Sequence, residues 1–199
     1  MRRICFPILL LAVVLSLFGC AAQGPQTAPQ PGTGEPLAAA YKEETITQAG
    51  LETYKKQLAY VEGEENLPSD REILDSLLKN IILLEEAQAQ GLTPTQGEIE
   101  TYLQETLYTA CALPEGKALI DDYCASQGVS YADYEADLRD QAPRFLARAK
   151  LKEKVARDYC QAHNLTWEAN NWPQEVQEAV AAYEEDLWQA HKKDVIYYR

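Results

Sequence analysis

A set of helix start and stop signals along the middle of the chain most constrains its fold. Ser69-Asp70-Arg71-Glu72 and Thr95-Gln96-Gly97-Glu98 each place a hydroxyl at a helix N-cap and a carboxylate three residues later, which is the pattern of a capping box. Ser130-Tyr131-Ala132-Asp133 repeats the pattern with aspartate. Gly91 and Gly128 stand where a left-handed residue ends the preceding helix. These signals predict successive helices and a mainly α-helical domain.

The helix predicted after Ser69 is unusually apolar. Turned at about 100° per residue, the segment 73–84 is apolar over roughly half of its circumference. Asp75, Lys79 and Glu86 gather on the remaining polar side. A helix of this kind is covered from more than one direction, so we expect it in the middle of the domain.

Two short stretches rich in β-forming residues lie at opposite ends of the predicted domain, at 39–47 and 194–199. Each is too short to be stable alone, so we expect residues 41–45 to pair with 195–198. The predicted fold has about six helices, and a short two-stranded ribbon joins the N- and C-terminal ends of the domain. We expect Pro143 to kink the long helix after Ser130, because proline removes a backbone donor.

The first residues have the pattern of an export signal, which we expect to span residues 1–19. Arg2 and Arg3 precede the apolar run 4–18, which is too short for a comfortable membrane span. The run closes on Leu17-Phe18-Gly19-Cys20, which resembles a bacterial lipobox, although Phe18 is bulky for its position. The resemblance implies lipidation at Cys20 and an extracytoplasmic protein anchored to the bacterial cell membrane. An ordinary signal peptide followed by a chance cysteine remains the alternative.

Residues 20–37 are rich in Pro, Gly, Gln and Thr and predict a flexible tether, followed by one domain at 38–199. The whole chain has 199 residues and a formal net charge of −13, and loss of two leader arginines takes the charge to −15. Such an acidic chain is repelled by nucleic acid and by anionic lipid. We therefore expect no nucleic-acid partner and attribute membrane contact to the lipid on Cys20.

The sequence carries no nucleotide-binding glycine loop, HExxH, GxSxG or zinc-type cysteine spacing. We therefore expect no enzymatic activity, no catalytic residue, no metal and no cofactor. The predicted domain contains Cys111, Cys124 and Cys160, an odd number at unequal spacing. An oxidising compartment would permit one disulfide, for which Cys111 and Cys124 are the closest pair in sequence. Small buried thiols are an equally good interpretation.

Three segments resemble the N-terminal domain of SurA, which the PrsA-type foldases share and trigger factor carries more distantly. These segments are "ITQAGLETYKKQL", "ILDSLLKNIILLEEAQAQGLTPTQGEIETYLQE" and "YCASQGVSYADYEADLRDQAPRFLARAKLKEKV". The resemblance covers roughly residues 40–160 together with the last helix and strand. It implies a helical chaperone domain whose first and last strands pair. The relatives insert a parvulin prolyl isomerase domain after the long helix, whereas only residues 158–199 follow here, so we expect no isomerase activity.

The resemblance implies a holdase-type chaperone that binds unfolded or partly folded exported polypeptides. The alternative is a structural or adaptor lipoprotein that docks one folded envelope partner. Apolar and aromatic positions of the predicted helix stripes are candidates for client contact, although the same stripes also fit ordinary core packing. The candidate client-binding residues are Tyr54, Leu58, Tyr102, Leu107, Tyr108, Tyr134 and Phe145.

Overall fold

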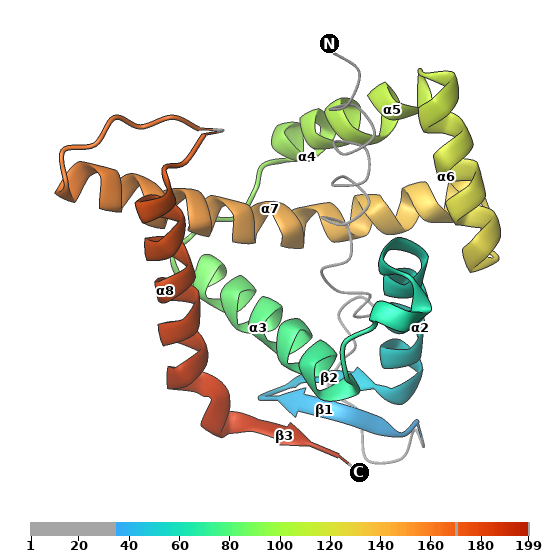
Figure 1. The fold of residues 1–199 in the computed structure, drawn as a ribbon, viewed down its shortest axis with the longest axis horizontal. Coiled ribbons are helices and arrows are strands. Elements are labelled where there is room, and N and C mark those ends of the chain that lie inside the picture. The colour runs from blue at the N-terminus through green and yellow to red at the C-terminus, as the bar shows by residue number, and fades with distance from the viewer. Residues whose placement is uncertain (1–34, 170, 199) are drawn as a thin grey trace.

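The computed structural model describes residues 35–169 and 171–198 (Figure 1). The predicted signal peptide, Cys20 and most of the predicted tether lie outside the described residues. Leu37, which we assigned to the tether, is instead the first residue of a strand. The described chain is mainly helical with a small antiparallel sheet, which confirms the predicted class.

The elements follow one another in the order strand, strand, helices, strand. They are β1 (Leu37–Tyr41), β2 (Glu44–Thr47), α2 (Gln48–Glu62), the 3₁₀ turn η1 (Glu64–Asn66), α3 (Asp70–Ala89), α4 (Gln96–Leu103), the π-helical turn η2 (Gln104–Tyr108), α5 (Thr109–Cys111), α6 (Pro114–Gln127), α7 (Tyr131–Ala162), α8 (Gln174–His191), the 3₁₀ turn η3 (Lys192–Asp194) and β3 (Val195–Tyr197). In Figure 1, α7 crosses the molecule, with α4 on one side of it, α3 and the sheet on the other, and α6 across one end of α7.

The three predicted capping boxes are present and begin α3, α4 and α7. In each, the N-cap side chain accepts a hydrogen bond from the backbone N–H three residues on, and that residue's carboxylate accepts one from the N-cap backbone. Gly91 and Gly128 have φ values of 71° and 72°, the left-handed conformation expected after a helix end. Pro143 lies inside α7, which runs from Tyr131 to Ala162 as one helix, and the kink expected there stays a prediction.

The sheet has the strand order β2-β1-β3, with both neighbours antiparallel to β1. Tyr41 pairs with Val195, and the Tyr198 N–H donates to the Ala38 carbonyl over 2.9 Å, so the predicted pairing of the two ends is confirmed. The prediction was wrong for residues 44 and 45, which turn back to pair with β1 instead of β3. A two-residue turn makes this possible, and Lys42 adopts a φ of 53° within it.

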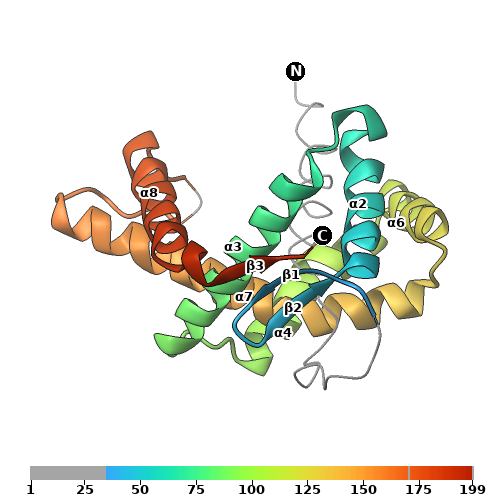
Figure 2. The ribbon, with the colours of Figure 1, turned by 90° about the horizontal axis from the view of Figure 1, so that it is seen from below.

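The core is centred on α3, as its apolar circumference predicted. Buried side chains recur along α3 from Ile73 to Ala87, and the helix contacts α2, α7, α8 and β1 (Figure 2). The main apolar cluster joins α3 to the sheet, α2, α4, α6 and the first half of α7. A smaller cluster, with Cys160 and Val176, joins the end of α7 to α8. No helix among the described residues is both long and apolar enough to cross a bilayer.

Candidate functional site

The seven candidate client-binding residues divide according to their burial. Tyr54 and Leu107 are 9% and 2% exposed and belong to the main core, so they offer a client no surface in this conformation. The other five candidates are half-buried and remain accessible in part: Leu58, Tyr102, Tyr108, Tyr134 and Phe145. The helix stripes therefore combine residues that fill the core with residues that flank it.

One accessible candidate, Tyr134 of α7, belongs to a cluster of three tyrosines. The Tyr134 ring meets the Tyr123 ring of α6 edge-on at 5.4 Å between centroids, and Tyr123 meets Tyr60 of α2 in the same way at 5.2 Å. We call Tyr60, Tyr123 and Tyr134 the tyrosine cluster. Tyr123 is buried between the other two, which are half-buried. Two helices, α2 and α7, thus present partly accessible tyrosine rings on either side of a buried one, and such rings can contact both apolar and polar groups of a ligand.

Carboxylates surround the tyrosine cluster. The Tyr60 hydroxyl donates to Asp122 over 2.8 Å, and burial together with this bond raises the pKa of Tyr60 to about 12. Burial raises the pKa of Tyr123 further above its usual value, and the charge of Asp137 adds to the effect. Both hydroxyls therefore stay protonated at neutral pH. The electrostatic environment is negative, which favours ligands that bring a positive charge.

A second aromatic contact lies where α4 crosses α7. The Tyr102 and Phe145 rings are 5.3 Å apart between centroids in a tilted arrangement. Because each ring covers part of the other, these two candidates hold the helices together and offer a client only their outer edges.

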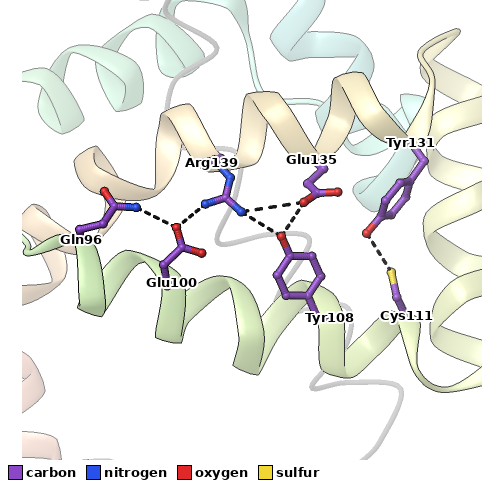
Figure 3. Close-up of polar contacts among 7 residues, drawn as sticks. All are labelled: Gln96, Glu100, Tyr108, Cys111, Tyr131, Glu135 and Arg139. Carbon is purple, nitrogen blue, oxygen red and sulfur yellow. Dashed lines mark hydrogen bonds and ion pairs between the residues drawn. The ribbon is translucent and has the colours of Figure 1, made fainter.

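Tyr108 belongs to a polar network that ties η2 to α7 (Figure 3). Its hydroxyl donates to Glu135 over 2.5 Å and accepts from the Arg139 guanidinium over 3.0 Å. Arg139 also pairs with Glu100 of α4. The Glu135 bond and burial raise the pKa of Tyr108 above its usual value, while Arg139 opposes the change. This candidate is therefore a structural clamp between helices, and its hydroxyl is already occupied.

Cys111 and Cys124, the pair for which a disulfide is possible, are both free thiols in this structure. Cys111 donates instead to the Tyr131 hydroxyl over 3.7 Å, a bond that Figure 3 shows between α5 and α7. Cys124 is buried in the main core, and burial raises the pKa of its thiol. Cys160 is buried in the cluster between α7 and α8. The alternative interpretation, small thiols used for packing, describes Cys124 and Cys160.

A pocket of about 330 Å³ lies beneath the turn between β1 and β2, and we call it the hairpin pocket. Buried Tyr41 and Ile81 contribute apolar wall, and the Tyr41 hydroxyl lies 2.7 Å from Nδ1 of His191. Glu85 pairs with Lys42 at the edge of the pocket. Burial opposes ionisation of Glu85, but hydrogen bonds from Lys42 and Tyr41 hold its pKa below the usual value. A pocket of this size accommodates one or two side chains of a bound segment.

The sequence interpretation missed the residues that complete these surfaces. Tyr123 lies at the apolar spacing of α6 with Ile120 and Cys124, so its stripe could have been found. The hairpin pocket could not, because its walls come from segments far apart in sequence. Within the described residues, no group of three or more His, Cys, Asp or Glu side chains is arranged to hold a metal ion.

Comparison of the chain with protein-family models, with curated proteins and with solved structures gave no match.

Proposed function

We propose that this protein is a lipid-anchored, extracytoplasmic holdase-type chaperone that binds unfolded or partly folded exported polypeptides without prolyl isomerase activity. The observation that carries the proposal is the tyrosine cluster, where partly accessible Tyr60 of α2 and Tyr134 of α7 flank buried Tyr123 of α6. Half-buried Leu58 and Val61 of α2 pack against the same core and extend the apolar character of this side. The resemblance of three segments to the SurA N-terminal domain supports the same function.

The location rests on the sequence. The basic and apolar leader that ends at Cys20 supports export and lipidation, and the Pro- and Gly-rich segment after it supports a tether. A lipid at Cys20 would hold the domain at the membrane despite an acidic surface that anionic headgroups repel.

Energetics favour weak binding that does not require a nucleotide for release. A client segment that buries two or three large apolar side chains gains about 1.5–3 kcal/mol for each. Loss of free motion and ordering of the segment cancel most of this gain. The affinity for one segment is therefore about micromolar or poorer, and a client leaves fast enough to fold on its own.

The test is suppression of the aggregation of a reduced, unfolding model protein by the purified full-length protein in lipid nanodiscs, with empty nanodiscs as the blank. We expect suppression at a several-fold molar excess, and Leu58→Ser should reduce it. Leu165→Ser is the matched control, because Leu165 is also half-buried but packs against the distant cluster of α7 and α8. Absence of suppression by the unaltered protein would contradict the proposal.

A second candidate function, docking of one folded envelope partner, is favoured by the position of two exposed apolar side chains. Ile196 is 55% exposed and Tyr198 is 42% exposed, and they lie two residues apart at the edge strand β3. Residues two apart in a strand point to the same face, so they form one small patch. Two results together would favour this function over the first. The protein would bind a folded partner tightly and stoichiometrically, with Ile196→Ser abolishing that binding, and it would not suppress aggregation.

A further inference from the structure

The hairpin pocket is walled by three elements that are far apart in sequence. One stripe of α3 contributes Ile81, Leu84, Glu85 and Gln88, whose spacing of three and four residues places them on one side of that helix. The turn between β1 and β2 forms a second wall, and α7 contributes Arg144. Apolar and polar groups therefore meet in one cavity of about 330 Å³.

The guanidinium of Arg144 has no partner among the described residues. Its side chain is half-buried and forms no ion pair or hydrogen bond with another described residue. The chain has 31 acidic against 18 basic residues, so carboxylates are abundant. The other basic residues of α7 that reach the surface each pair with a carboxylate: Arg139, Lys150, Lys152, Lys154 and Arg157. Arg144 is thus held at a cavity with its donors free to bind a carboxylate from another molecule.

The remaining charges of the pocket leave Arg144 as its accessible positive group. Lys42 pairs with Glu85, so the charges of these two side chains largely cancel. Glu43 and Glu44 lie in and beside the exposed turn, where water and salt screen their charges. Arg144 is less exposed than either carboxylate, so its charge is screened less. Its attraction for an anion inside the pocket therefore exceeds the repulsion from the turn.

The same pocket offers apolar surface. Tyr41 and Ile81 are buried, and Leu84 is half-buried. Exposed Gln88 adds an amide that forms no side-chain hydrogen bond with a described residue, so its NH₂ group can donate to a ligand. A ligand that suits this lining carries a carboxylate with an apolar group next to it.

We propose that the hairpin pocket binds a glutamate or aspartate side chain of a bound polypeptide together with a neighbouring apolar side chain. The carboxylate pairs with Arg144, whose planar fork of N–H donors matches two carboxylate oxygens. The apolar side chain packs on Ile81 and Leu84, which removes its surface from water. This inference rests on the proposed binding of polypeptides and names the side chains that the pocket selects.

The test compares two fluorescent, unfolded peptides with acetylated and amidated ends. They differ only in a central glutamate or glutamine, which stands next to the same leucine. Their binding to the full-length protein in nanodiscs of neutral lipid is measured by fluorescence polarisation. We expect the glutamate peptide to bind about threefold to fivefold more tightly. The net charge of −13 repels an acidic peptide, so general charge attraction cannot produce this preference.

Substitutions of Arg144 assign the preference to the pocket. Arg144→Gln should remove it and leave the affinity for the glutamine peptide unchanged, with no loss of thermal stability, because the side chain has no described partner. Arg144→Lys should retain part of the preference, since the charge remains without the fork. Arg157→Gln is the matched control and should retain the whole preference. Arg157 is exposed on the same helix and pairs with Glu153 outside the pocket, and its loss changes the total charge equally.

The outcomes separate the inference from the function on which it rests. Equal affinities for the two peptides, or an equal loss of preference in Arg144→Gln and Arg157→Gln, would overturn the pocket inference and leave the chaperone proposal standing. A third peptide, with the central glutamine and a free C-terminal carboxylate, tests the other source of the same group. Tighter binding of this peptide than of the glutamate peptide, lost in Arg144→Gln, would assign the pocket to chain ends and overturn the choice of side chains. Failure of all three peptides to bind the unaltered protein would contradict the chaperone proposal and the inference with it.

Discussion

Gly116 allows α6 to approach the short helix α5, and Gly116→Ala should therefore destabilise the protein. A Cβ atom at this position would lie 2.2 Å from the Ala110 carbonyl oxygen, whereas real Cβ contacts are essentially never below 3.0 Å. The obstacle is backbone, so it cannot rotate away, and α6 or α5 must shift by roughly 1 Å. Overpacking of this kind costs about 1–3 kcal/mol, which for a domain of this size lowers Tm by about 2–12 °C.

Gly97→Ala provides the matched control within α4. A Cβ atom there would meet only the Thr95 hydroxyl oxygen at 4.0 Å, so alanine fits without displacement. Reduced freedom of the unfolded chain should then raise stability by about 0.4–1 kcal/mol. Thermal unfolding of the full-length protein in mild detergent, followed by far-UV circular dichroism, measures both changes. A Tm for Gly116→Ala equal to or above that of the unaltered protein would refute the close approach of α6 to α5.

Three other predictions follow from local features. A hydrogen bond from Lys150 and further bonds from Thr95 lower the pKa of Glu98 to about 2. The contribution of Glu98 to stability is therefore present above pH 4.5 and lost as the pH falls towards 2. The fall of Tm over that pH interval should be shallower in Glu98→Gln. Deletion of 194–199 removes the pairing of β3 with β1 and should lower Tm by several degrees, at about 2–4 °C per kcal/mol, whereas an unchanged melting curve would contradict that pairing. Cys20→Ser should release the protein from membranes or leave it unprocessed, and full retention with normal processing would exclude a lipid anchor at this residue.

The helix boundaries could be predicted because their causes are local. A capping box needs only two side chains and the backbone between them, so four residues of sequence contain the whole interaction. The hairpin between β1 and β2 was missed because its cause is not local. Its turn lacks the Asn-Gly pair that marks such turns, and Lys42 adopts a positive φ that lysine seldom takes. Pairing with β1 fixes that conformation, and pairing is not visible in a single segment.

The candidate site could be predicted only in part, because a helix stripe does not reveal what covers it. Tyr54 and Leu58 follow one another on the same side of α2, yet only Tyr54 is fully buried. Leu107 lies in the π-helical turn η2, where the extra residue per turn shifts the direction of each side chain. Counting at 3.6 residues per turn therefore fails across this turn, and Leu107 points into the core.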